Sequence, residues 1–78
     1  MEREVGGSVY NVVELVGSSS KGWEDAVKNA VDTASEALTS LRIAEVKELD
    51  ARVAEGKIVQ YRARVRLSFK HEIEPETL

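Results

Sequence analysis

The strongest constraint in the sequence is a strict two-residue alternation over residues 59–70, within a segment 57–70 that predicts a strand. One set of alternate positions is apolar: Val59, Tyr61, Ala63, Val65, Leu67 and Phe69. The other set is polar and mostly basic: Gln60, Arg62, Arg64, Arg66, Ser68 and Lys70. Because successive side chains of a β-strand point to opposite faces, this pattern predicts a long strand with one apolar and one basic face.

Residues 41–53 predict a second strand, joined to the first by a short hairpin loop at residues 54–56. Gly56 suits the positive φ that tight hairpin turns need. The apolar alternation changes phase within this strand, from Ala44 and Val46 to Leu49, Ala51 and Val53. One extra residue on one strand produces such a change, so we expect a β-bulge at residues 47–48.

The N-terminal half predicts a strand followed by a helix. Residues 9–16 are β-branched and aromatic, and Gly17 with the serines at 18–20 is expected to end the strand. We expect a helix over about residues 20–39, with the serines capping its first turn. Its apolar stripe is Trp23, Val27, Ala30, Val31, Ala34 and Leu38. The alanines in this stripe let another element approach the helix closely.

These elements give an α+β fold of order β-α-β-β, in which a three-stranded antiparallel sheet packs on one helix. Strands 41–53 and 57–70 pair as a hairpin, whereas the pattern does not fix where strand 9–16 pairs. We expect one domain over residues 1–78, with flexible tails at 1–7 and 72–78.

The chain is too small to hold a large core. A domain of 78 residues supplies only ~3–5 kcal/mol from its core, and small proteins add disulfides, metals or partner subunits. There is no cysteine, which excludes disulfides and thiolate metal sites, and His71 is the single histidine. Self-assembly is the remaining way to supply the missing stability, and contacts between subunits also protect the edges of the sheet.

Composition narrows the functional classes. A net charge of −3 argues against binding to nucleic acid. No apolar run approaches the ~20 residues that a membrane-spanning helix needs. Residues 1–4 lack the pattern of a signal peptide, so we expect a cytoplasmic protein. Without a cysteine nucleophile, and with no base placed beside the serines at 18–20, we expect no enzyme.

Four segments are informative together: Val12 to Ser19 before a helix, Ala44 to Val46, the Gly56 hairpin, and Tyr61 to Lys70. With these segments the chain resembles one known family, the dodecins, over residues 8 to about 71. The resemblance implies a β-α-β-β subunit in a hollow homo-dodecamer, with flavin storage in the best-known members.

The resemblance also implies where a flavin would bind. Flavin-binding dodecins carry a tryptophan and a glutamine at the positions that align with Ile43 and Arg62. Ile43 has no ring to stack on the flavin, and a guanidinium has donors but no acceptor. The chain instead resembles a subgroup described as calcium dodecins, which lacks that tryptophan. The shared segments are residues 23–24, 42–44, 61–62 and 68–70.

Two groups of charged residues are candidate ligands. Glu45, Glu48 and Asp50 offer the carboxylate oxygens that calcium prefers, although strand geometry is expected to spread these carboxylates over two faces. Symmetry in an oligomer would bring copies of one carboxylate together. The competing interpretation is that Glu48 and Asp50 pair with arginines across the hairpin.

The second group is Arg64, Arg66 and Lys70, together with Arg62. Guanidinium groups suit the phosphates of anionic metabolites such as coenzyme A, which some dodecins are described as binding. Here the competing interpretation is a charge-paired sheet surface.

Three functions therefore stay open. The first is a self-assembling shell that sequesters a small ligand, either a divalent cation such as calcium or an anionic metabolite. The second is flavin storage with an altered site, and the third is a purely structural oligomer.

Overall fold

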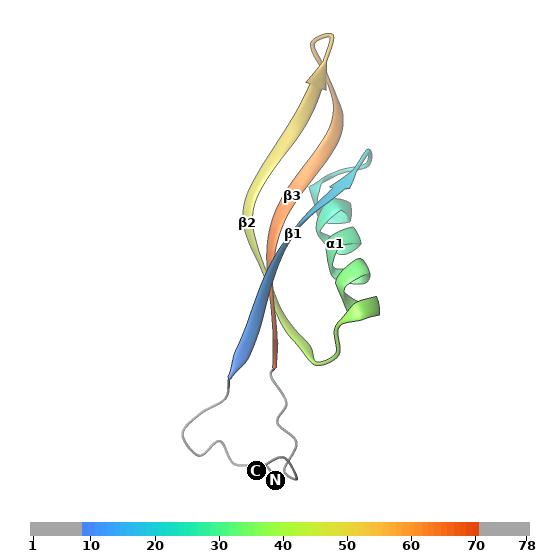
Figure 1. The fold of residues 1–78 in the computed structure, drawn as a ribbon. Helices are drawn as coiled ribbons and strands as arrows, with labels where there is room; N and C mark the ends of the chain where they lie inside the picture. The colour runs from blue at the N-terminus through green and yellow to red at the C-terminus, as the bar shows by residue number, and fades with distance from the viewer. Residues whose placement is uncertain (1–8, 71–78) are drawn as a thin grey trace, which may run out of the picture.

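The computed structural model describes residues 9–70, which form one helix and three strands (Figure 1). The elements are β1 (Tyr10–Ser19), α1 (Trp23–Ala37), β2 (Leu41–Ala54) and β3 (Lys57–Lys70). This order confirms the predicted β-α-β-β fold. The predicted flexible tails at 1–7 and 72–78 lie outside the described residues. Within residues 9–70, no helix is both long enough and apolar enough to cross a membrane.

The strand with the strictest alternation, β3, is the central strand of the sheet. The order is β1-β3-β2, and both neighbours run antiparallel to β3. β1 pairs with residues 61–70, from Tyr10 opposite Lys70 to Ser19 opposite Tyr61. The β2–β3 hairpin therefore continues past the end of β1, as Figure 1 shows at its upper end.

The hairpin, the positive φ of Gly56 and the bulge confirm the predictions made for them, although Ala54 still pairs with Lys57 and the loop is one residue shorter than the predicted 54–56. Glu55 has a φ of 53° and Gly56 a φ of 75°, the pair of positive values that a two-residue type I′ turn needs. The β2–β3 register shifts between Val46 and Glu48, which places the bulge at residues 47–48. Two further shifts, at 41/43 and 52/53, were not predicted.

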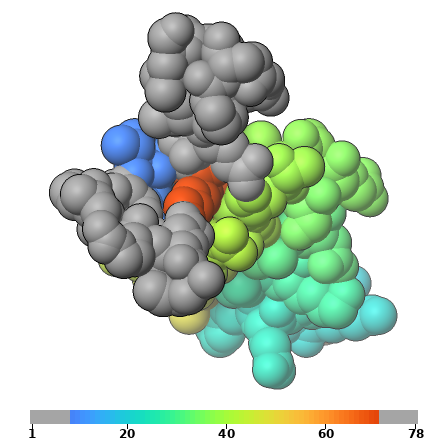
Figure 2. Space-filling view, turned by 90° about the horizontal axis from the view of Figure 1, so that it is seen from below, coloured from blue at the N-terminus to red at the C-terminus, as the bar shows by residue number. Residues whose placement is uncertain are grey.

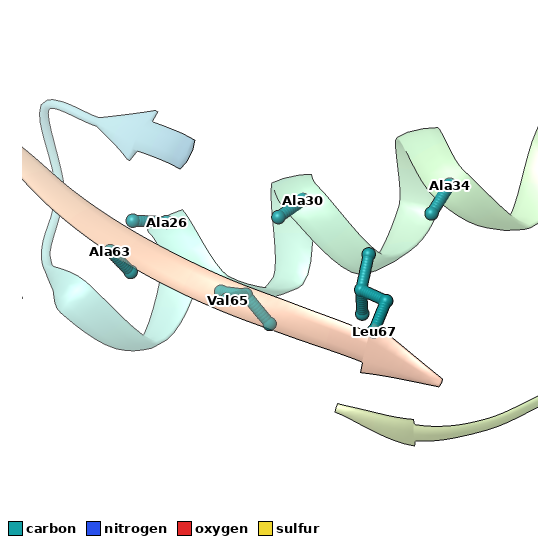
Figure 3. Close-up of a cluster of buried hydrophobic side chains, with 6 residues drawn as sticks. All are labelled: Ala26, Ala30, Ala34, Ala63, Val65 and Leu67. Carbon is teal, nitrogen blue, oxygen red and sulfur yellow. The ribbon is translucent and has the colours of Figure 1, made fainter. Parts of the chain in front are cut away.

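The helix covers one face of the sheet, mainly over β1 and β3. Seen from below, the helix lies on one side of the strand ends (Figure 2). Six side chains, four of them alanines, form the buried core between the layers (Figure 3). They are Ala26, Ala30 and Ala34 from α1, and Ala63, Val65 and Leu67 from β3. The predicted helix stripe contained two of these alanines and missed Ala26.

Trp23 belongs to the predicted apolar stripe but is not part of the buried core. It remains 38% exposed at the first residue of α1. Its indole N–H donates to the carbonyl oxygen of Asp50 at 2.8 Å, and its ring meets Tyr61 edge-on with centroids 4.9 Å apart. Trp23 therefore ties the start of the helix to β2 and β3.

The prediction that serines cap the helix is wrong. β1 runs through Ser19, and the helix begins only at Trp23, after Gly22 as N-cap without a side-chain cap. The Ser19 hydroxyl accepts a hydrogen bond from the Lys21 amide and donates one to Asp25. Ser19 is held in the sheet opposite Tyr61. Its hydroxyl therefore links the end of β1 to Lys21 and Asp25, and it does not cap the first turn of the helix.

Gly17 is the point of closest approach between β1 and α1. A Cβ atom there would lie 2.1 Å from the Ala26 carbonyl oxygen and 3.0 Å from the Ala30 Cβ. The first of these atoms belongs to the helix backbone, so it cannot move aside as a flexible side chain would. The helix can occupy its position only because residue 17 has no side chain.

Gly17→Ala is therefore expected to destabilise the fold by about 2–3 kcal/mol, the upper part of the range for overpacked sites. Gly22→Ala is the matched control, because its backbone is extended and a Cβ there meets nothing within 4 Å. Its expected cost is below about 1 kcal/mol. Denaturant unfolding at equal chain concentration measures both, and equal costs would contradict the close approach.

Candidate functional site

The face of the sheet opposite α1, here called the open face, carries the charged residues that the sequence singled out. Arg62, Arg64 and Arg66 project from β3 in a row along the middle of this face. Because β3 is central, each arginine has a residue of β1 on one side and a residue of β2 on the other. The row therefore lies within reach of carboxylates from both neighbouring strands.

Every arginine of the row forms an ion pair with a carboxylate. The pairs are Arg62 Nε–Asp50 Oδ1 at 2.8 Å, Arg64 Nε–Glu48 Oε1 at 3.1 Å and Arg66 Nη2–Glu14 Oε2 at 3.3 Å. The first pair is bidentate, with Arg62 Nη2 also 3.0 Å from Asp50 Oδ2. The competing interpretation of cross-strand pairing for Glu48 and Asp50 is thus what the structure contains.

The bulge at Lys47 changes how the β2 carboxylates are arranged. Glu45, Glu48 and Asp50 lie opposite Arg66, Arg64 and Arg62 respectively. Because residues directly opposite each other share a face, all three carboxylates lie on the open face. The expectation that they spread over two faces is wrong. It assumed regular alternation along β2, whereas the extra residue at Lys47 brings Glu48 to the same face as Glu45.

The bidentate pair shifts the pKa of both of its residues, Asp50 and Arg62. Hydrogen bonds from Arg62 hold the pKa of the Asp50 carboxyl below its usual value, with smaller contributions from the charges of Arg62 and Arg64. The same hydrogen bond raises the pKa of the Arg62 guanidinium. The side chains of the three pairs are 40–66% exposed, so water screens them and each adds little to stability.

The described part of one chain, residues 9–70, contains no group of side chains that could form a metal centre. Among residues 9–70, no three side chains of the His, Cys, Asp or Glu type lie close enough to hold an ion. Of the three candidate carboxylates, Glu45 forms the longest ion pair, with its Oε2 3.5 Å from Lys47 Nζ. Glu48 and Asp50 are committed to arginines at 3.1 Å or less.

The candidate anion site is likewise not an open cluster of cations. Arg64 and Arg66 are engaged by Glu48 and Glu14, so an anion would have to displace a carboxylate. Lys70 lies at the end of the row opposite Tyr10, and its backbone amide donates to the carbonyl of Ser40.

The two positions that align with flavin contacts lie on the open face but far apart. Ile43 lies opposite Ser68, and Arg62 is six residues away from Ser68 along β3. At about 3.3 Å per residue this separation is roughly 20 Å. One chain does not bring these positions together, so a pocket that used both would need two copies of the chain.

Glu14 belongs to this cluster but was not among the predicted site residues. Its role depends on the β1–β3 register, which places it opposite Arg66. The alternation predicts which face of its own strand each side chain occupies. It does not predict that β1 pairs with β3, so the contact between Glu14 and Arg66 could not be foreseen.

A shallow pocket of about 290 Å³ lies elsewhere, between the outer edge of β1 and α1. Asn29 closes one side of it by donating from Nδ2 to the Ser18 carbonyl oxygen at 2.9 Å. None of the predicted site residues lines this pocket.

The comparisons with known proteins agree with this geometry. The profile of the dodecin family matches residues 9–72, and the chain belongs to that family. Calcium dodecin of Mycobacterium tuberculosis is 36% identical over 63 residues, which are 81% of this chain and 89% of the relative. The crystal structure of that relative, described as calcium chelating with a novel calcium-binding site, superimposes with a TM-score of 0.74 at 35% identity. This match covers 83% of this chain and 93% of the relative.

A second solved structure supports the same fold. The dodecin from Streptomyces coelicolor superimposes with a TM-score of 0.83 at 31% identity, over 90% of this chain and all of the other. The observed strand order and helix position are therefore shared with family members that differ in sequence at two positions in three.

The Asp50–Arg62 pair predicts a specific pH dependence. Because the folded state lowers the pKa of Asp50, the stabilisation it gives is complete above the usual aspartate value of about 4 and is lost as the pH falls below it. Asp50→Asn should therefore lower the free energy of unfolding slightly at pH 7, and this difference should shrink as the pH falls below that value.

Chemical denaturation at a series of pH values measures that difference. Glu36→Gln, on the exposed side of α1, is the control and should change stability little at pH 7. A difference for Asp50→Asn that grows as the pH falls would contradict the assigned pairing.

Proposed function

We propose that this chain, as a single domain, assembles into a closed homo-dodecamer that binds and stores a small ligand, and that this ligand is a divalent cation such as calcium. The proposal places the protein in the cytoplasm, without a catalytic role and without nucleic acid or membrane partners. Its parts rest on different observations.

Assembly is supported by the small core. Only Leu67 and Val65 are large and fully buried, whereas eleven large apolar side chains of the described residues are at least 38% exposed. Burying such a side chain fully stabilises a fold by ~1.5–3 kcal/mol, so one chain leaves much of this stabilisation unused. Contacts between copies would recover it.

The observation that favours a cation over an anion is the pairing of the arginine row. Each arginine already has a carboxylate within 3.3 Å, which neutralises the row as a receptor for phosphate. Glu45 adds a further carboxylate to the same face with only a 3.5 Å contact to Lys47. Calcium takes six to eight oxygen ligands, so Glu45 from several copies around a symmetry axis is the arrangement we propose.

Similarity to calcium dodecin supports the same ligand, because the name and description of that relative state calcium binding. Flavin is disfavoured because Ile43 offers no ring to stack on it, and because Asp50 occupies Arg62 on two nitrogen atoms.

Native mass spectrometry with and without calcium tests the proposal. We expect a particle of twelve 8.6 kDa chains that retains calcium and loses it to a chelator. Glu45→Gln should weaken calcium binding by roughly tenfold or more, since the charge and number of oxygen ligands set calcium affinity. Glu36→Gln is the matched control and should leave the affinity unchanged.

A calcium affinity that is equal in both variants would remove Glu45 from the site. A dodecamer that retains no calcium would leave a structural role, and a bound anionic metabolite in the mass spectrum would favour the arginine row.

Riboflavin titration tests the exclusion of flavin. Losing a stacked ring and a directed hydrogen bond should cost roughly 2–4 kcal/mol, which weakens binding about thirty- to a thousandfold. We expect weak quenching of riboflavin fluorescence by this protein and stronger quenching by the Ile43→Trp, Arg62→Gln variant. Tight quenching by the unmodified protein would show that these two positions do not decide flavin binding.

A further inference from the structure

We propose that the pocket between the outer edge of β1 and α1 binds a small molecule that carries an N-acylated amino-acid unit, and that this unit pairs with the backbone of Val16. The pocket has a volume of about 290 Å³, and its lining includes Leu15, Val16, Ser18, Asn29 and Thr33. None of these residues takes part in the proposed cation site, so the inference goes beyond the proposed function.

The backbone of Val16 points out of the sheet edge towards this pocket. β1 is an edge strand, because the sheet order is β1-β3-β2 (Figure 1). Along such a strand, the N–H and C=O groups of alternate residues point to the neighbouring strand and to the free edge. Asn29 Nδ2 donates to the Ser18 carbonyl oxygen at 2.9 Å, so that carbonyl points to the free edge. Val16 lies two residues earlier in the same unshifted register, so its N–H and C=O point the same way.

A contact at the other end of the sheet gives the same orientation. The Lys70 amide donates to the carbonyl oxygen of Ser40, on the β2 side of β3. Lys70 therefore does not exchange backbone hydrogen bonds with Tyr10, its partner on β1. Counting in twos from Tyr10 leads to Val16 and then to Ser18. Two contacts at opposite ends of β1 thus agree that Val16 presents its backbone groups at the free edge.

The side chain of Asn29 shows which chemistry this edge accepts. Its amide N–H group donates to the Ser18 carbonyl, where a pairing strand would place a backbone N–H. Val16 offers the next donor and acceptor along the same edge, and no group of residues 9–70 bonds to them on this side. An N-acylated amino-acid unit carries an N–H and a C=O at the spacing with which paired residues exchange two hydrogen bonds. Such a unit therefore matches Val16.

The pocket suits a small molecule better than a strand of another protein. Ligand pockets have volumes of about 300–1,000 Å³, and this pocket lies at the lower limit. Asn29 already occupies the Ser18 carbonyl, so pairing along the edge stops there. Leu15 and Ala30 add apolar atoms to the lining, and Thr33 adds a hydroxyl group. The lining thus provides for one apolar group and one further polar group of the ligand.

Saturation-transfer NMR with N-acetylvaline amide as the probe tests this site. The control ligand is the matched ester, in which an oxygen atom replaces the acyl N–H, so that the shape is kept and the donor to the Val16 carbonyl is lost. We expect the ester to bind about tenfold more weakly, because one hydrogen bond is lost and the carbonyl stays unpaired. Thr33→Trp should fill the pocket and abolish binding. Ser35→Trp is the control variant, since residue 35 is exposed on α1 outside the pocket, and it should keep binding.

Equal binding of amide and ester to the unmodified protein would overturn the pairing with Val16, and binding of neither would overturn the site. This comparison needs no variant, so it decides the matter even if Thr33→Trp does not fold. Equal binding by the two folded tryptophan variants would also overturn the site. A hexapeptide that binds at least about tenfold more tightly than the probe would show that the edge accepts a strand instead of a small molecule. None of these results involves calcium, so each leaves the proposed function in place.

Discussion

The backbones of β1 and α1 touch at Gly17, and the position of the helix on the sheet follows from that contact. Alanines at 26, 30 and 34 keep the helix close to β1 and β3, and four of the six buried core side chains between the layers are alanines. This closeness limits the core to a few residues and leaves β2 largely uncovered. The apolar surface that results is the physical reason for expecting partner subunits.

A second constraint, the extra residue at Lys47, sets the chemistry of the opposite face. It turns Glu45, Glu48 and Asp50 to the same side as the arginines of β3. Without the bulge, part of β2 would place apolar side chains opposite the arginine row and carboxylates on the helix side. One residue therefore keeps the helix side apolar and the open face charge-paired.

Local patterns predicted much of the fold. The alternation in β3, the positive φ of Gly56 and the phase change in β2 each depend on residues close in sequence, and the structure confirms all three. The misses concern contacts between distant residues. The pairing of Glu14 with Arg66 and the contact of Trp23 with Asp50 depend on strand order and helix position, which alternation does not encode. Ser19 was misjudged because Gly17 resembles a strand terminator, whereas here it permits close packing.

The central claim is that contacts between copies supply stability that one chain lacks. Equilibrium unfolding in guanidinium over a hundredfold range of chain concentration tests it most directly, since association stabilises by mass action. The account predicts that the midpoint rises steadily with concentration and that unfolding and refolding curves coincide. A midpoint that stays constant over the whole range would show that a single chain is stable by itself, which would contradict the account.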